Sequence, residues 1–276
     1  MSLSFIPTVW AARLLVALDN ALIYGQANVC NREYEGSISK SGNTVKIASI
    51  GDVNVQNYSR DTDISDPDAL SDDVQTLLID QAKYFNFCVD SIDRAQQNVN
   101  VLDEAMRRAA WSLRNHADQF LAGRMAAAVP AANVIGDPTP IVPTKENAYE
   151  YLVDLGVLLD QGNAPTEGRF VVVPAWFHGL LLKDDRFVRS GTTAGDRRLR
   201  NGEVGEAAGF TILKSNNVPA EADAEYKIIA GHSFATAYVE QILDVQTYKP
   251  EKRFGDAVKG LHVYGAKVVK ATSLAM

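Results

Sequence analysis

The sequence predicts an α+β fold, and three observations support this prediction. Residues 44–47 and 53–55 alternate apolar and polar side chains, which is typical of half-buried strands. From Ile92 the apolar residues recur at every seventh position as far as Phe120, which indicates a long helix. Beyond a proline-rich stretch at 129–144, short apolar runs alternate with helical patterns. Extended strands, one long helix and a mixed region are therefore expected in that order.

Composition limits the function classes. The chain has 276 residues, of which 46% are hydrophobic, so it can bury a sizeable core. Its net charge of -7 argues against a generally basic surface for nucleic acid. Cys30 and Cys88 form no CxxC pair, so a metal knuckle or disulfide framework is not expected and reduced thiols fit best. No run reaches the ~20 apolar residues of a membrane span, and the N-terminal stretch lacks a signal-peptide pattern. We therefore expect a soluble protein without membrane contact.

The N-terminal third is predicted to hold a helix and two extended arms. Residues 8–24 show helical apolar spacing, and that apolar face needs a partner. An extended segment follows, with turn residues at 41–43, and strand character returns over 74–90. Between the arms the chain is strongly acidic. The acidic residues are Asp61, Asp63, Asp66, Asp68, Asp72 and Asp73. Because like charges repel, an open, solvated tip or a contact with another subunit is the simplest interpretation.

A calcium loop is the alternative for this acidic tip. Asp61, Asp63, Ser65 and Asp72 match ligand positions of an EF-hand loop in part. Asp66, however, occupies the glycine position, and no convincing helix flanks the segment. The sequence therefore favours the solvated tip or the subunit contact, and no metal or other cofactor is expected.

The long helix is expected to run from 92 to 129, on the order of 50 Å at about 1.5 Å per residue. A coiled-coil dimer is one interpretation of its apolar seam. The seam is rich in alanine and is interrupted by Trp111 and His116, so a helix laid across a sheet fits at least as well.

The region after the proline-rich stretch is predicted to be mixed. We expect helices at 146–161 and 175–184, strands at 169–174, 210–213 and 226–231, and a small-residue helix after the last of these. Residues 190–203 form a polar loop, and residues 242–270 contain two final strands. The last strands are expected to return to the long helix, which makes its domain discontinuous.

Two patterns suggest chemistry. Gly202, Gly205 and Gly209 are spaced like a phosphate loop, but a strand follows where a helix N-terminus would be needed, so a turn is favoured. Gly231–Ala235 resembles a nucleophile elbow around Ser233, with Asp244 and His262 following in order. The eleven positions from Ser233 to Asp244 leave no room for a helix and the next strand, which argues against a hydrolase.

Other polar groups carry weaker signals. The four histidines, at 116, 178, 232 and 262, have no metal-ligand spacing and are expected to be ordinary core or surface residues. Arg197, Arg198 and Arg200 could contact a phosphate or a carboxylate-bearing neighbour, and a solvated loop is an equally good interpretation.

Several segments together resemble the major capsid proteins of tailed bacteriophages, which have the Hong Kong 97-type fold. FIPTVWAARLL resembles the N-terminal arm. EYEGSISKSGNTVKIASI, the acidic tip and LLIDQAKYFNFCVDSIDRAQQ resemble the extension loop and its return strand. Residues 92–129 resemble the spine helix, and GEVGEAAGFTILKSNNVP resembles a turn and strand of the axial domain. IIAGHSFATAYVEQI and FGDAVKGLHVYGAKVV resemble the closing segments.

The resemblance implies a division into an N-terminal arm, an extended β-hairpin loop, a peripheral domain with the spine helix and its sheet, and an axial domain. The expected bounds are 1–30, 31–90, 91–130 with 243–276, and 131–242 in that order. It also implies a structural function without catalysis or cofactors. Copies would form pentamers and hexamers of an icosahedral shell around double-stranded DNA, bound without sequence specificity. The expected location is the virion, with assembly in the host cytoplasm.

Differences between this sequence and the family pattern indicate which partner proteins to expect. The chain begins directly at the arm, so a separate scaffolding protein is expected beside a portal protein. No crosslinking lysine, asparagine and supporting acid can be matched, so noncovalent contacts or a decoration protein are expected to hold the shell. The opposite charges suggest that Asp61–Asp73 lies against Arg197, Arg198 or Arg200 of a neighbour. An encapsulin-type nanocompartment shell is the alternative within the fold, and a small serine hydrolase is the alternative outside it.

Overall fold

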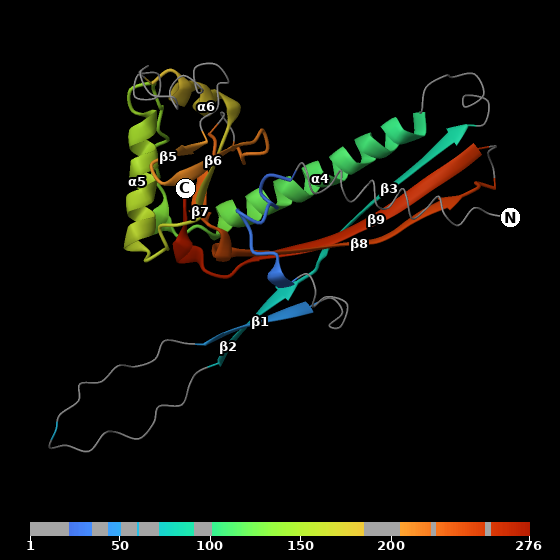
Figure 1. The fold of residues 1–276 in the computed structure, drawn as a ribbon, viewed down its shortest axis with the longest axis horizontal. Coiled ribbons are helices and arrows are strands. Elements are labelled where there is room, and N and C mark those ends of the chain that lie inside the picture. The colour runs from blue at the N-terminus through green and yellow to red at the C-terminus, as the bar shows by residue number, and fades with distance from the viewer. Residues whose placement is uncertain are drawn as a thin grey trace.

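The structure is a computed structural model that describes residues 22–34, 44–50, 60, 72–90, 101–184, 205–221, 225–251 and 255–276. In these ranges the strands form a three-stranded, a five-stranded and a two-stranded sheet. Figure 1 shows a long sheet with a helix along it, a compact unit at one end, and a hairpin projecting from the side.

The long sheet contains β3 (Gln81–Asp90), β9 (Gly255–Val268) and β8 (Thr236–Tyr248), in the order β3-β9-β8 and antiparallel throughout. Helix α4 (Val101–Ala128) lies along one face of it (Figure 1). Met106, Ala110 and Leu113 of the helix pack against Val245 and Val258 of the sheet. The interpretation of a long helix laid across a sheet is confirmed, and the final strands do return to it.

The compact unit is built on a five-stranded sheet with the order β10-β7-β4-β6-β5. Its strands are β10 (Leu274–Ala275), β7 (Ile229–His232), β4 (Arg169–Val173), β6 (Phe210–Lys214) and β5 (Glu206–Ala207). Strands β4 and β6 are parallel, whereas the other pairs are antiparallel. Because β4 is covered on both faces, all five of its residues are buried, Arg169 as well as the apolar run that follows it.

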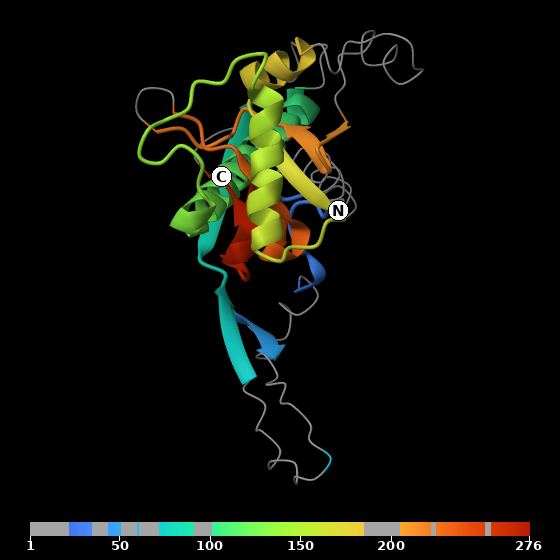
Figure 2. The ribbon, with the colours of Figure 1, turned by 90° about the vertical axis from the view of Figure 1, so that its left-hand side faces the viewer.

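Helices cover one face of this sheet. Helix α5 (Ala148–Gln161) and helix α6 (Ala175–Leu182) share a core with Val171, Val173 and Phe210. Figure 2 views this end of the molecule with α5 in front of the sheet. Phe170 and Val172 point to the other face, where they share a core with Leu121 and Met125 of α4 and with residues 22–30. The two helices and the strands of this region were predicted correctly, apart from the two-residue strands β5 and β10.

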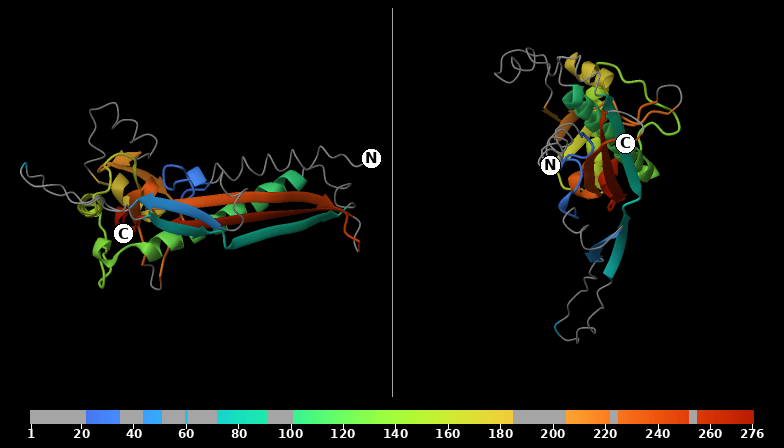
Figure 3. Two further views of the ribbon diagram at one scale, coloured as in Figure 1. Left: turned by 90° about the horizontal axis from the view of Figure 1, so that it is seen from below. Right: turned by 90° about the vertical axis from the view of Figure 1, so that its right-hand side faces the viewer.

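Strands β1 (Thr44–Ile50) and β2 (Asp72–Leu78) form an antiparallel hairpin, with Thr44 opposite Leu78 and Ile50 opposite Asp72. Val45, Ile47 and Leu77 are buried against Ala237 and Val239 of β8. The hairpin and α4 lie on opposite faces of the long sheet (Figure 3). The predicted extended arms are therefore confirmed for residues 44–50 and, apart from residues 79–80, for the returning segment 74–90, although β2 begins two residues earlier than predicted.

The prediction of a helix after residues 226–231 is wrong. Ser233–Ala235 forms a single 3₁₀ turn, and β8 begins at Thr236. Small residues suggested a helix locally, but Tyr238 and Val239 pair across to β9, and that tertiary pairing prevails over local propensity. Strand β8 continues without a break across the expected domain boundary at 242/243, and β10 joins the five-stranded sheet.

Several expectations fall outside the described residues. These are most of the N-terminal helix at 8–24, the turn at 41–43, the strand at 53–55, the start of the long helix at 92–100, the acidic residues 61–71 and the polar loop 190–203. In the part of the chain that is described, no helix is long and apolar enough to cross a membrane. The same part contains no cluster of side chains suited to a metal ion.

Candidate assembly interface

The glycine-rich segment forms a β-hairpin turn. Ala208 and Gly209 have φ values of 51° and 79° and connect β5 to β6, with Ala207 paired to Phe210. Two central residues with positive φ are typical of the tight turns that match strand twist. A Cβ at Gly209 would meet nothing within 4 Å, so backbone conformation and not space favours glycine there. The prediction of a turn is confirmed.

The SNNVP segment after β6 contacts a buried carboxylate, that of Asp118. The Asn217 backbone N–H donates to Ser215 Oγ at 3.0 Å, and its side-chain amide donates to Asp118 Oδ2 at 3.2 Å. The Ile23 and Tyr24 backbone N–H groups donate to Asp118 Oδ1 at 3.0 and 2.8 Å. One carboxylate on α4 therefore joins the N-terminal segment 22–34 to the five-stranded unit.

Asp118 is 3% exposed. Burial raises its pKa above the ordinary value, and the hydrogen bonds from Tyr24, Asn217 and Ile23 offset this effect only in part. Nothing in the sequence pattern singled this residue out, because Asp118 lies five positions after Leu113 and therefore off the apolar seam that the sequence predicts for the long helix.

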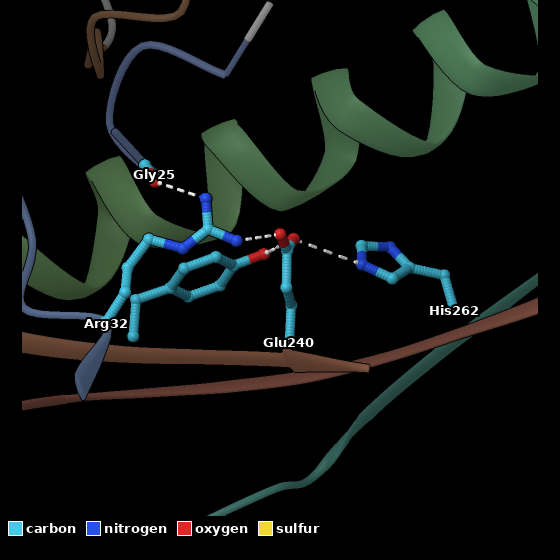
Figure 4. Close-up of polar contacts among 5 residues, drawn as sticks. Gly25, Arg32, Glu240 and His262 are labelled. Carbon is cyan, nitrogen blue, oxygen red and sulfur yellow. Dashed lines mark hydrogen bonds and ion pairs between the residues drawn. The ribbon is translucent and has the colours of Figure 1, made fainter. Parts of the chain in front are cut away.

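A second carboxylate, of Glu240, is 12% exposed and holds the other end of segment 22–34. Arg32 forms an ion pair with Glu240 of β8 and donates to the Gly25 carbonyl oxygen at 3.3 Å (Figure 4). The Tyr238 hydroxyl donates to Glu240 Oε2 at 2.8 Å, and His262 Nε2 lies 3.5 Å from the same oxygen. Asn31 also pairs with β8, through hydrogen bonds to Thr236 and Tyr238. The segment is thus bound along the edge of the long sheet.

Burial and neighbouring charges together set the pKa values of the side chains around Glu240. Burial, the largest single influence, raises the pKa of the Glu240 carboxyl, but His262, Arg32 and Tyr238 together outweigh it, and the pKa is lowered. Burial also raises the pKa of the Tyr238 hydroxyl well above its usual range, with the Glu240 charge adding to the effect. The cluster therefore carries an ionised carboxylate and a neutral phenol at neutral pH.

The root of the hairpin is fixed on β9. The Gln75 side chain donates to the Val269 carbonyl oxygen at 3.3 Å, and Lys267 donates to the Thr76 carbonyl oxygen at 3.1 Å. A Cβ at Gly265 would lie 2.3 Å from the Leu78 carbonyl oxygen, so only glycine lets the chain cross β9 this closely. The direction of the hairpin is therefore set by backbone contact.

The outer side of the hairpin exposes two apolar side chains beside the polar Lys46 and Thr76. Val74 and Leu78 are 44% and 58% exposed, while their neighbour Leu77 is fully buried. Within the described residues, β1 and β2 pair only with each other. A two-stranded hairpin is marginal by itself in water, so this one gains stability when another surface covers it.

The serine hydrolase interpretation finds no support in this geometry. A strand follows the turn at Ser233, whereas a nucleophile elbow needs a helix. His262 is buried beside Glu240, and His232 accepts a hydrogen bond from the Phe234 backbone N–H at 3.2 Å. Asp244 lies opposite Leu261 in the β8–β9 ladder.

The remaining predicted groups divide into described and undescribed ones. His116 is exposed, His178 is half-buried, and of the two free cysteines Cys30 is buried and Cys88 exposed. The residues predicted to contact a neighbouring subunit lie outside the described ranges. They are Asp61, Asp63, Asp66, Asp68, Arg197, Arg198 and Arg200.

Comparison with known proteins identifies this arrangement. The family model described as phage capsid protein matches residues 52–276. A chain from Mycobacterium phage Che8 is 33% identical, with a TM-score of 0.76, and the match covers 90% of this chain and 89% of that one. A search of curated proteins found no match.

Two more distant structures share the fold. The capsid structure of the cyanophage P-SCSP1u is 18% identical, with a TM-score of 0.67 and coverage of 85% of this chain and 83% of that one. A virus-like particle from Pyrococcus furiosus is 13% identical, with a TM-score of 0.59 and coverage of 98% of both chains. The fold alone does not separate these particles, but the family match does, and neither the nanocompartment nor the hydrolase alternative is supported.

Family and fold identify a structural protein of the virion, not an enzyme, whose copies assemble into a capsid. The chain belongs to the phage capsid protein family and is a major capsid protein with the Hong Kong 97-type fold.

Proposed function

We propose that copies of this chain form pentamers and hexamers, and that these close into an icosahedral shell around double-stranded DNA. The observation that carries the proposal is the projecting hairpin, whose buried face is satisfied within the chain while Val74 and Leu78 remain exposed. Contact with a neighbouring copy would cover these two side chains, and a head-to-tail contact of this kind generates closed rings.

We further propose the functional division into arm 1–30, extension loop 31–90, peripheral domain 91–130 with 243–276, and axial domain 131–242. The arm would tie adjacent copies together. A separate scaffolding protein would direct assembly in the host cytoplasm, a portal protein would admit the DNA, and a decoration protein or noncovalent contacts would hold the finished shell.

Electron microscopy and sedimentation of the purified protein test this proposal, with and without co-expressed scaffolding candidates. We expect closed shells or five- and six-membered rings. A uniform monomer or dimer under every condition would contradict the proposed assembly.

Removal of residues 2–20 tests the role of the arm. We expect the shortened chain to remain folded by circular dichroism but to form no shells, because copies are no longer tied together. Wild-type shell formation by the shortened chain would refute this role.

The acidic segment is proposed to contact basic side chains of a neighbouring copy, with Arg197, Arg198 and Arg200 as candidates. Reversing the charge of Asp61, Asp63, Asp66 and Asp68 should lower the yield of shells and change its dependence on salt. A matched control reverses four exposed acids elsewhere, namely Asp137, Asp154, Glu206 and Glu225. Equal yields from the two variants would exclude a specific contact, and recovery on reversing the three arginines would support it.

A further inference from the structure

His262 is a buried base beside the ion pair of Arg32 and Glu240. Its side chain on β9 is 0% exposed, and its Nε2 lies 3.5 Å from Glu240 Oε2. Neither ring nitrogen has a hydrogen-bond partner among the described residues. Buried polar groups are normally hydrogen-bonded, so this ring holds unused capacity to bind a proton and donate it.

The two oxygens of the Glu240 carboxylate serve different partners. Arg32 pairs with Oε1, whereas the Tyr238 hydroxyl donates to Oε2, which is also the oxygen nearest His262. Figure 4 shows Arg32 and His262 on opposite sides of the carboxylate. Since the Tyr238 hydroxyl is neutral, Arg32 is the cation that balances Glu240, and His262 is the neighbour that can acquire a positive charge near neutral pH.

Several charged and titratable groups lie on the elements packed around His262. They are Tyr264 of β9, Lys83 of β3, Tyr238 and Glu240 of β8, Arg114 and Asp118 of α4, and Arg32 of segment 22–34. Among these groups, Glu240 is the anion that the ring contacts. A second positive charge on this carboxylate is opposed by Arg32 while the ion pair is formed.

The attachment of residues 30–34 to β8 has few parts. The Asn31 N–H donates to the Thr236 carbonyl oxygen at 2.8 Å, and the Tyr238 N–H donates to the Asn31 carbonyl oxygen at 3.0 Å. The ion pair is the third part, and the Arg32 and Glu240 side chains are 22% and 12% exposed, so solvent reaches it. Residues 30–34 lead towards β1, so this attachment fixes where the chain enters the hairpin.

We propose that opening of this attachment is coupled to uptake of one proton by His262, which then replaces Arg32 as the charge partner of Glu240. Departure of Arg32 leaves a largely buried carboxylate without a cation, which is costly. A proton from solvent on the imidazole restores the balance. Because the open form binds one proton more than the closed form, the fraction open should rise about tenfold for each unit of pH lost while His262 titrates.

The hydrogen bonds at Asp118 act in the opposite sense. The pKa of that carboxyl is raised in the folded chain, so acid strengthens the other end of segment 22–34. Acid is therefore expected to loosen residues 30–34 selectively. The coupling needs no neighbouring copy, and it stands or falls separately from the assembly of a shell.

The first test follows the His262 ring by NMR in the purified, unassembled protein as pH is varied. The chain has four histidines, and His262→Gln assigns the signal. In Arg32→Gln the midpoint of the His262 titration should lie about one pH unit or more above that of the wild type. In Arg32→Lys, which keeps the cation, it should stay close to the wild type.

Arg108→Gln is the matched control, since it removes an exposed arginine that also contacts a carboxylate, that of Glu104. Its His262 midpoint should equal that of the wild type. An unchanged midpoint in Arg32→Gln would overturn the proposal. Equal increases in Arg32→Gln and Arg108→Gln, or in Arg32→Gln and Arg32→Lys, would overturn it as well.

The second test needs no change at Arg32 and uses the buried thiol of Cys30 as a reporter. The Cys30 Sγ donates to the Tyr24 carbonyl oxygen at 3.0 Å. In Cys88→Ser it is the remaining cysteine of the chain, so a thiol reagent reports its exposure. The labelling rate, divided by that of the unfolded protein at the same pH, should rise from about pH 8 to about pH 6. In His262→Gln/Cys88→Ser this rise should disappear.

A cysteine elsewhere separates local opening from unfolding of the whole chain. Ala230→Cys in a Cys30→Ser/Cys88→Ser background places a thiol at a fully buried position of β7. Its normalised labelling should not follow the rise seen for Cys30. Equal pH dependence at the two positions, or a rise at Cys30 that persists without His262, would overturn the proposal.

Discussion

Asp118, which is buried, and Glu240, whose side chain is 12% exposed, are two carboxylates that hold the same segment, residues 22–34, by different chemistry. Asp118 accepts hydrogen bonds from neutral donors: two backbone N–H groups and the amide of Asn217. Glu240 is surrounded by the Arg32 guanidinium, the Tyr238 hydroxyl and the His262 ring. The first site satisfies backbone donors, and the second pairs charges.

This difference explains why the two pKa values move in opposite directions. Neutral donors do not fully offset burial, so the pKa of Asp118 is raised. At Glu240, contact with His262 and the charge of Arg32 outweigh burial, so the pKa is lowered. Burial alone therefore does not decide the charge of a carboxylate, because the donors around it do.

The largest effect is expected for Asp118→Ala. It removes the acceptor of the Ile23 and Tyr24 N–H groups and leaves them buried, at a cost on the order of 3 kcal/mol of unfolding free energy. Denaturant unfolding of the unassembled protein measures this cost. Asp154→Ala, an exposed acid on α5, is the control and should cost much less. Equal costs for the two variants would show that Asp118 does not hold the segment.

Glu240→Gln should cost less, about 2 kcal/mol, because glutamine keeps the size and an acceptor for Tyr238 but leaves Arg32 without its charge partner. The same unfolding measurement applies. Glu104→Gln removes an exposed carboxylate that also contacts arginine, and it should change stability by about 0.5 kcal/mol or less. A cost at Glu240 as small as at Glu104 would contradict the role of the Arg32–Glu240 pair.

Acid should act on the two sites in opposite directions. The pKa of Asp118 is raised above 3.8, so its contribution to stability is full below that pH and is lost as the pH rises through the folded-state pKa. The pKa of Glu240 is lowered below 4.5, so its contribution is present above that pH and is lost as the pH falls through the folded-state pKa.

The measurement compares unfolding free energies of Asp118→Asn and Glu240→Gln with the wild type from about pH 7 to about pH 4 and below. The cost of Asp118→Asn should grow as the pH falls, and the cost of Glu240→Gln should shrink. If the costs of both substitutions changed in the same direction with pH, the assignment of neutral donors to Asp118 and of a charged partner to Glu240 would be wrong.

The smallest effect is expected for Arg32→Lys, at about 1 kcal/mol. Lysine keeps the charge near Glu240 but cannot also reach the Gly25 carbonyl oxygen or stack over the Tyr238 ring, where the guanidinium lies 5.7 Å from the centroid. The stability of Arg32→Lys should fall between those of the wild type and Glu240→Gln. A destabilisation larger than that of Glu240→Gln would show that Arg32 acts mainly through its other contacts.

Local patterns predicted much of the fold. The alternation at 44–47, the apolar spacing of the long helix and the turn before Phe210 depend on neighbours in the chain, and the structure has each of them. The small-residue run after Ser233 was misjudged for the same reason, since its strand state comes from pairing with β9. The order of the segments also carried the family resemblance.

The two carboxylate sites could not be predicted from the sequence. Arg32 and Glu240 are separated by 208 positions, and Tyr24 and Asp118 by 94. Asp118 also lies off the apolar seam predicted for the long helix, so the sequence pattern indicated neither its burial nor its donors.

What the sequence by itself determined is most of the elements, their order and the family, because propensity, periodicity and turn chemistry act over a few residues. What only the tertiary structure decided is which distant groups meet: the donors around Asp118, the Arg32, Tyr238 and His262 side chains around Glu240, and the crossing over β9 at Gly265. Those long-range contacts depend on sheet register and helix packing. Register and packing are properties of the whole chain, because each contact is stabilised only when the elements that carry it are already in place.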